Sequence, residues 1–207
     1  MKGEFKRYIA VAGNMGVGKS TLVQFLTSQF SGHPFYEAVT DNPYFNKFFK
    51  DMRRWAFHSQ LSFLSKKFHM HQRLEKMPGL VVLDRTIYED AEIFAKGLYK
   101  MGNISKDDFD LYWELYRSMC QSIRPPDLLI FLTCSIKTLK HRIKMRGRLA
   151  EKSAPDSYLR RLQQDYEQWI EKVDFCPVQK IDTDKTNYLE DLAHRADIIR
   201  IFEKYLH

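Results

Sequence analysis

The segment Gly13–Ser20 constrains this chain more than any other part of it. It reads Gly-Asn-Met-Gly-Val-Gly-Lys-Ser, which satisfies the pattern G-x-x-x-x-G-K-[ST], and it follows the apolar run Tyr8–Ala12. Glycines let the backbone turn tightly so that its N–H groups face phosphate oxygens, while a helix start and Lys19 add positive charge. The motif therefore predicts an ATP or GTP site with Mg²⁺ on Ser20. Its expected nucleotide-binding residues are Gly13, Asn14, Met15, Gly16, Val17, Gly18, Lys19, Ser20 and Thr21.

Short apolar runs alternate with longer helical patterns along the chain. This alternation is typical of a parallel sheet covered by helices. We therefore expect one α/β domain over residues 1–207, with a P-loop NTPase-type five-stranded parallel sheet flanked by helices. The predicted strands are Tyr8–Ala12, His33–Val39, Leu80–Leu83, Leu128–Leu132 and Val178–Ile181. The predicted helices are Ser20–Gln29, Arg53–Lys76, Tyr88–Lys100, Lys106–Ile123, Ile136–Arg146, Pro155–Lys172 and Tyr188–Tyr205.

Positive charge is concentrated near one helix end. The net charge of +7 favours anionic partners, and six basic side chains gather in Lys140–Arg148. Arg142 and Arg146 are four residues apart and share a helix face, and Gly147 allows the helix to break after them. A basic lid over residues 146–154, carrying Arg148 and Glu151, is expected to close over the nucleotide. The alternative is a solvated basic helix end.

The cysteines and the apolar runs indicate the cellular compartment in which the protein works. Cys120, Cys134 and Cys176 are odd in number and form no C-x-x-C pair, which indicates neither a disulfide framework nor a zinc site. The first apolar run has five residues, and no later run approaches the roughly 20 needed to cross a bilayer. We expect a cytoplasmic protein with no membrane partner.

A second part of the site is expected after the strand Leu80–Leu83. Asp84 and Arg85 follow it, at the end of a buried strand, where open α/β sheets bind their ligands. Asp84 is a candidate Mg²⁺ ligand, and Arg85 can neutralise a transferring phosphoryl group or hold the acceptor oxygen. The alternative is an acidic strand cap followed by a solvated arginine.

Taken together, these motifs resemble the deoxynucleoside kinase family over nearly the whole chain, in a form similar to bacterial members. The resemblance implies an enzyme that transfers the γ-phosphoryl group of ATP, held with Mg²⁺, to the 5′-hydroxyl of a deoxynucleoside in nucleotide salvage. It also implies a homodimer formed by helices between the second and fourth strands, such as Lys106–Met119. The matching segments are Gly13–Ser20, Tyr36-Glu37, Asp41–Pro43, Trp55–Gln60, Asp84–Asp90, Ile93–Ala95 and Arg142–Glu151.

The resemblance also implies roles for single residues. Glu37 takes the proton of the 5′-hydroxyl as general base, Arg85 holds the 5′-oxygen, and Asp84 contacts Mg²⁺. Gln60 reads the edge of the base with Asp90 nearby, and Phe94 stacks on the base. From the residues alone, Glu37 can equally be a solvated strand-end carboxylate, Gln60 a helix-surface amide and Phe94 an ordinary core aromatic.

Two positions depart from the family pattern. Phe49 stands where animal relatives carry a tyrosine that binds the sugar 3′-hydroxyl, so sugar recognition is expected to fall to Glu151 or Tyr44. Lys67 stands where an arginine helps to set base preference, and it offers a point charge in place of a planar fork. Base specificity stays open, with a lean toward deoxyadenosine or deoxyguanosine.

Two alternative functions share the phosphate-binding motif. A nucleoside monophosphate kinase similar to thymidylate kinase would bring a charged acceptor, which Glu37 would repel unless that charge were compensated. A P-loop nucleotide-dependent nucleic-acid-binding module fits the positive charge. However, the sequence has no RNA-recognition signature, no helix-turn-helix pattern and no N-K-x-D, so no nucleic-acid partner is expected.

Overall fold

The computed structural model of this chain describes residues 6–36, 41–147 and 155–206. Five strands form one sheet in the order β2-β3-β1-β4-β5, and every pairing in it is parallel. The prediction of a five-stranded parallel α/β sheet is therefore confirmed. The strands are β1 (Lys6–Gly13), β2 (His33–Phe35), β3 (Gly79–Asp84), β4 (Leu128–Thr133) and β5 (Val178–Asp182).

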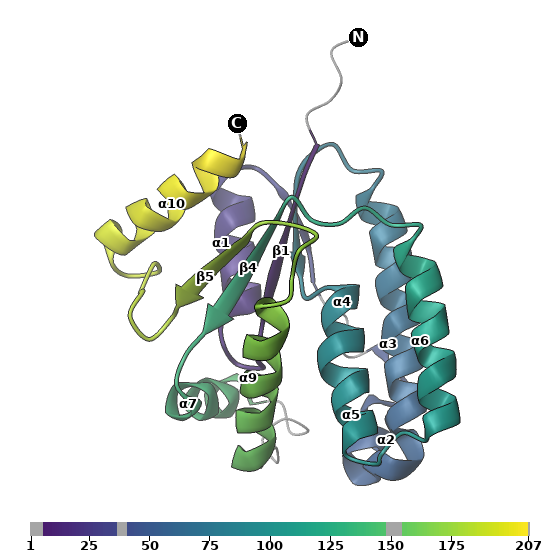
Figure 1. The fold of residues 1–207 in the computed structure, drawn as a ribbon. Helices are drawn as coiled ribbons and strands as arrows, with labels where there is room; N and C mark the ends of the chain where they lie inside the picture. Colours follow the sequence, from purple (N-terminus) through teal and green to yellow (C-terminus); the bar gives the residue numbers. More distant parts are fainter. Residues whose placement is uncertain (1–5, 37–40, 148–154, 207) are drawn as a thin grey trace.

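Helices cover both faces of the sheet (Figure 1). Successive side chains of β1 alternate between two cores, because Ile9 and Val11 pack on one side and Tyr8, Ala10 and Ala12 on the other. The first core is closed by α1 (Lys19–Gln29), α7 (Ile136–Arg146) and α10 (Leu192–Leu206). The second is closed by α3 (Met52–Leu74), by α4 (Ile87–Glu89) and η2 (Asp90–Ala95), which α5 (Lys96–Lys100) continues, and by α6 (Lys106–Cys120) and α9 (Asp156–Ile170).

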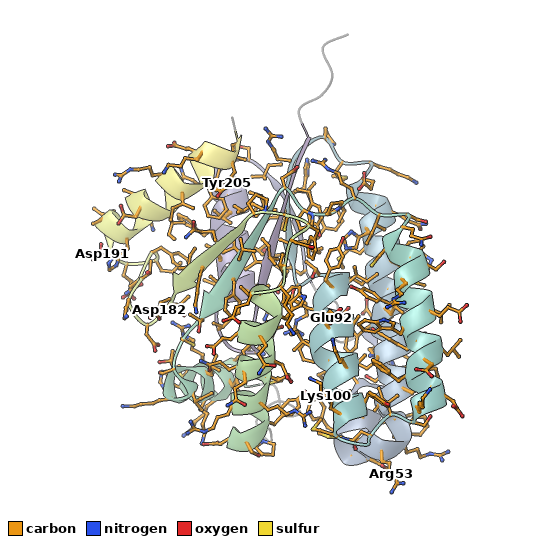
Figure 2. All side chains as sticks on the ribbon, viewed as in Figure 1. Arg53, Glu92, Lys100, Asp182, Asp191 and Tyr205 are labelled. Atoms are coloured by element: carbon orange, nitrogen blue, oxygen red, sulfur yellow. The ribbon has the colours of Figure 1, made fainter. Side chains whose placement is uncertain are left out.

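Side chains fill the space that separates α9 from the α4–α5 run in the ribbon view (Figure 2). Tyr166 of α9 is fully buried there, with its ring centroid 5.9 Å from that of Phe131 on β4 and 6.4 Å from that of Phe94 on η2. Aromatic pairs of this kind add to the burial of apolar area. The packing fixes α9 against both the sheet and η2.

Several element boundaries differ from the sequence prediction. β2 ends at Phe35, because this edge strand pairs only with β3 and over three positions. The short helix α2 (Phe45–Lys50) was not predicted, and the helix expected over Tyr88–Lys100 contains the π turn η2. The helix expected from Tyr188 begins at Leu192, since the Asp191 carboxylate accepts from the His194 N–H and caps the first turn there. No helix in the described ranges combines the length and apolarity needed to span a membrane.

His71 of α3 makes stability depend on pH. Its ring is fully buried beside Tyr8, and neither ring nitrogen has a hydrogen-bond partner within the described part of the chain. Burial, aided by the positive charge of Lys67, lowers the pKa of His71 to about 3. Below pH about 6.5 the unfolded chain therefore binds a proton at this position that the folded chain does not, and stability falls as pH falls toward about 3.

We expect His71→Leu, which keeps a similar volume, to reduce this loss. On acidification from pH 7.5 to 5.5, the unfolding free energy of the variant should fall by about 1 kcal/mol less than that of the wild type. Urea unfolding at the two pH values measures both quantities. An equal fall in the two proteins would contradict a buried neutral histidine.

Candidate active site

The phosphate loop, residues 13–20, is fitted closely between β4 and α7. Gly13 has φ +142°, and a Cβ there would lie 2.6 Å from the carbonyl oxygen of Leu132. Gly16 has φ +79°, and a Cβ there would lie 2.8 Å from the Ile143 Cγ1. Glycine is required at both positions, by backbone conformation and by space. The turn delivers the chain into α1, whose first residue is Lys19.

Side chains of the loop are held from several directions. Asn14 is buried, and its Nδ2 donates to the carbonyl of Leu159 at 2.9 Å, which ties the loop to α9. Lys19 is also buried, and its Nζ donates to the Asn14 carbonyl at 3.1 Å. Asn14 thus supports the loop, whereas Lys19 lies beside the space that a phosphate would fill.

Ser20 and Asp84 meet where β3 ends beside the loop. The Ser20 hydroxyl donates to Asp84 Oδ2, while Asp84 Oδ1 is buried and has no hydrogen-bond partner among the described residues. Carboxylate and hydroxyl oxygens suit Mg²⁺, which protein sites hold through one or two side chains, water and substrate phosphates. The pair fits that role. The described ranges contain no cluster of three His, Cys, Asp or Glu side chains that could form an all-protein metal cage.

Arg85 follows Asp84 with a left-handed backbone. Its φ is +67°, which costs a non-glycine residue about 1–3 kcal/mol and persists only where the surroundings enforce it. Its N–H donates to the Val11 carbonyl at 3.0 Å, and its carbonyl accepts from the Lys67 Nζ at 2.9 Å. The guanidinium lies 4.5 Å from the ring centroid of Phe94. Neighbouring groups therefore fix both the backbone and the side chain of Arg85.

Lys67 lies below this turn. It is buried, and its Nζ also lies 3.4 Å from the Asp84 carbonyl oxygen. It does not line the cavity described next. In this structure the ammonium group of Lys67 therefore supports the Asp84–Arg85 turn.

One cavity, which we term the acceptor cavity, opens beside Arg85 and has a volume of about 240 Å³. Its walls come from the phosphate loop, α2, α3, the end of β3, η2, the end of α7 and α9. It brings together most of the residues expected to bind substrate. Of the predicted residues it contains Met15, Lys19, Ser20, Phe49, Gln60, Asp84, Arg85, Asp90, Phe94 and Arg146.

Other residues of this cavity were not predicted. Two of them, Phe45 and Phe48 of α2, form an aromatic wall together with the predicted Phe49, with neighbouring ring centroids 5.1–5.2 Å apart. These phenylalanines are clustered in the sequence, but because α2 was not predicted, the sequence did not indicate where their rings lie. Tyr158 comes from α9, and burial raises the pKa of its hydroxyl to about 12, so it stays protonated. The remaining lining residues are Tyr36, Ser59 and Phe63.

Tyr44, one of the two residues expected to bind the sugar, is not among the residues that line the acceptor cavity. Its ring stacks on that of Trp55, with centroids 5.6 Å apart, and it lies 5.4 Å from the ring of His58. The turn before α2 directs Tyr44 toward α3. The other residues expected at this end of the site, Glu37, Arg148 and Glu151, lie outside the described residues.

A second cavity, which we term the donor cavity, lies on the other side of the phosphate loop and has a volume of about 710 Å³. Arg142 anchors it. Its Nη1 donates to the Val17 carbonyl at 2.9 Å and to Thr183 Oγ1 at 2.8 Å. Thr183 and Tyr188 belong to the segment after β5, part of which was expected to be helical. The cavity is lined by Gly16–Thr21, Thr138, Arg142, Arg146, Thr183, Asp184 and Thr186–Glu190.

The two cavities meet at three shared residues, Lys19, Ser20 and Arg146. Two of these side chains are cationic. A polyphosphate in the donor cavity can therefore direct its terminal phosphate toward the junction, where an alcohol in the acceptor cavity can approach it. Such an arrangement provides the positioning and charge stabilisation that phosphoryl transfer needs.

Comparison with known proteins agrees with this geometry. A family model described as deoxynucleoside kinase matches residues 9–207. A deoxyadenosine/deoxycytidine kinase of Bacillus subtilis (strain 168) is 36% identical over 201 residues, covering 96% of this chain and 93% of the relative. A deoxyguanosine kinase of Lactobacillus acidophilus is also 36% identical, covering 92% of this chain and 87% of the relative.

Solved structures extend the comparison to three dimensions. The deoxyadenosine kinase of M. mycoides with dCMP and dCDP bound has a TM-score of 0.84 and 28% identity, covering 95% of this chain and 99% of that one. The same enzyme with dATP bound has a TM-score of 0.83. These findings favour the kinase prediction over the thymidylate kinase-like and nucleic-acid-binding alternatives. The structure combines the phosphate loop, the Asp84–Arg85 turn and two cavities that meet at the loop. Together with the family model and the relatives, it shows that the chain belongs to the deoxynucleoside kinase family.

Proposed function

We propose that this kinase transfers the γ-phosphoryl group of ATP to the 5′-hydroxyl of a purine deoxynucleoside in nucleotide salvage. The junction of the two cavities at Lys19, Ser20 and Arg146 is the observation that carries this proposal. ATP occupies the donor cavity, with its phosphates along the phosphate loop. The nucleoside occupies the acceptor cavity, with its 5′-hydroxyl directed toward Arg85.

In the acceptor cavity, each proposed role follows from a side chain's chemistry. Gln60 offers both a donor and an acceptor to a base edge, and Asp90 lies in the same cavity. Phe94 offers a flat ring for stacking on the base. Phe49 replaces the expected tyrosine with an apolar ring, so Glu151 remains our proposed partner of the sugar. Glu151 is proposed from the family resemblance.

Phosphoryl transfer requires a base and several cations. Glu37, proposed from the same resemblance, removes the proton of the 5′-hydroxyl. Arg85 holds the 5′-oxygen, and Lys19 and Arg146 offset the charge of the transferring group from the junction. Arg142 and Arg148 complete the charge around ATP, and closure of residues 146–154 excludes water.

Mg²⁺ is the proposed cofactor, held by the hydroxyl of Ser20 and the carboxylate of Asp84. The supporting observation is the buried Asp84 Oδ1, which lacks a hydrogen-bond partner within the described ranges, on a residue that lines the acceptor cavity beside Ser20. When bound, the ion offsets negative charge on phosphate oxygens.

Asp84→Asn is expected to weaken the use of Mg²⁺, because a neutral amide replaces the carboxylate. The Mg²⁺ concentration at half-maximal rate should rise at least about tenfold. A magnesium titration of the reaction at saturating ATP measures it. Asp197→Asn, on the exposed face of α10, is the matched control and should leave the titration unchanged. An unchanged requirement in Asp84→Asn would remove that residue from the site.

A substrate panel tests the function and the base preference together. The four deoxynucleosides and their monophosphates would each be incubated with ATP, and ADP formation would be measured. We expect turnover of deoxynucleosides, highest with deoxyadenosine or deoxyguanosine. The names of the relatives, which include deoxyadenosine and deoxyguanosine kinases, support this preference. Turnover of monophosphates alone would replace the proposal with a monophosphate kinase.

We further propose a homodimer in the cytoplasm. The family resemblance implies that α6 forms the contact between subunits. On this helix Leu111 is 49% exposed and Trp113 packs between Phe109 and Tyr116. Sedimentation equilibrium, compared between the wild type and Leu111→Glu, tests this face. The cytoplasmic location is supported by three cysteines that are all free thiols, as a reducing compartment favours.

A further inference from the structure

Glu89 is a buried carboxylate with no part in the mechanism above. Its side chain has no solvent exposure, and it lines neither cavity. Four hydrogen bonds converge on it. Oε1 accepts from the Gly13 N–H at 3.3 Å and from the Tyr166 hydroxyl at 2.8 Å. Oε2 accepts from the Thr86 N–H at 2.8 Å and from the Thr86 hydroxyl at 3.2 Å.

A capping box explains only half of this arrangement. Thr86 and Glu89 cap α4 reciprocally, and this motif needs one carboxylate oxygen. Oε1 is directed away from the cap, to the first residue of the phosphate loop and to α9. The carboxylate therefore joins three segments that are far apart in the sequence: residues 13, 86 and 166.

The connection at Thr86 reaches Arg85. The bond from the Thr86 N–H fixes the peptide that follows Arg85, the residue with the left-handed backbone. In addition, Arg85 Nε lies 3.8 Å from Glu89 Oε1. Glu89 thus contacts both the backbone next to Arg85 and its guanidinium, and the same carboxylate holds Gly13. It links the cation of the acceptor cavity to the start of the phosphate loop.

The charges around Glu89 favour the same link between Arg85 and the phosphate loop. Burial raises the pKa of Glu89, while the positive charges of Arg85 and Lys19 oppose the rise. A buried carboxylate beside a site for anions is unfavourable for ligand binding unless such contacts compensate it.

We propose that Glu89 is a positioning residue for phosphoryl transfer, which holds Arg85 in register with the phosphate loop through Thr86 and Gly13. This inference rests on the role proposed for Arg85 at the 5′-oxygen. Displacing a positioned group by about 1 Å can cost about 100-fold in rate. Loss of the Glu89 contacts should therefore lower kcat.

Glu89→Gln tests the proposal. Both carboxylate oxygens accept from N–H groups, so an amide nitrogen must oppose either Gly13 or Thr86. With both substrates saturating, kcat per nucleotide-binding site should fall about 10- to 100-fold, while both KM values change less than about threefold. Counting sites with a fluorescent ATP analogue corrects for any unfolded fraction. A kcat per site equal to that of the wild type would overturn the proposal.

A double-mutant cycle separates positioning from general support of the fold. If Glu89 acts through Arg85, adding Glu89→Gln to Arg85→Ala should lower kcat less than about threefold further. If Glu89→Gln lowered kcat by the same factor in the Arg85→Ala background as in the wild type, the proposal would be overturned.

Tyr166→Phe provides a second variant if Glu89→Gln does not fold. It removes one of the four hydrogen bonds and leaves the carboxylate in place. It should lower kcat about three- to tenfold in the wild type and little in Arg85→Ala, and equal factors in the two backgrounds would overturn the proposal. The wild type is assayed in parallel, so a wild type that phosphorylates no deoxynucleoside identifies failure of the proposed function instead.

Discussion

Replacing Arg85 with alanine is expected to lower kcat about 100- to 1,000-fold, because the variant loses the cation that holds the 5′-oxygen as charge shifts during transfer. Arg85 lines the acceptor cavity and not the donor cavity. ATP binding should therefore change little. Steady-state kinetics with the preferred deoxynucleoside, together with calorimetric titration of ATP, would measure the two effects separately.

Arg142→Ala is the matched control, since it removes a guanidinium that lines only the donor cavity. Its expected signature is the reverse: a higher KM for ATP with a smaller loss of kcat. If Arg85→Ala instead weakened ATP binding as strongly as it slowed turnover, Arg85 would be a ligand of the donor nucleotide. The assignment to the 5′-oxygen would then be wrong.

Glu37→Gln should produce a comparable or larger defect. An amide cannot take the proton of the 5′-hydroxyl, and removal of a general base costs about 100- to 10,000-fold in kcat. ATP affinity should stay close to that of the wild type, because the missing group acts on the acceptor. Rapid-quench measurement of the first turnover would show whether the chemical step itself has slowed.

The pH dependence provides an independent check on Glu37. A wild-type base must be ionised, so kcat should fall on the acidic side of its pKa, whereas the residual rate of Glu37→Gln should lack that limb. Glu37→Asp keeps a carboxylate and is expected to recover part of the rate. Full turnover by Glu37→Gln would mean that the hydroxyl needs no protein base.

The phosphate-binding side of the site could be predicted because short, continuous segments of the sequence determine its structure. The segment from Gly13 to Ser20 carries its conformation in the closely spaced glycines 13, 16 and 18, and the carboxylate of Asp84 comes directly after an apolar strand. Parallel strands bring their carboxyl ends to one edge, so both residues were expected at that edge, but the direct contact of Ser20 with Asp84 depends on β3 lying beside β1.

The nucleoside side was harder to predict, because its walls depend on helix packing. Phe45 and Tyr158 come from helices separated by more than 100 residues, and nothing in either segment identifies the other. Tyr44, which was expected to contact the sugar, depends on packing in the same way, because its ring stacks on Trp55 of α3. Glu89 lay within a matched motif, yet its contact with Gly13 becomes apparent only in three dimensions.

The narrow overlap between the two cavities has an evolutionary consequence. Within the described ranges, the acceptor and donor walls share Lys19, Ser20 and Arg146 and are otherwise made of different residues. A mutation at Ser59 or Phe63 can therefore alter which nucleoside is accepted without altering which triphosphate is used. Descendants of such a protein can diversify in substrate range through a few changes in α3, while the phosphate-handling machinery is inherited intact.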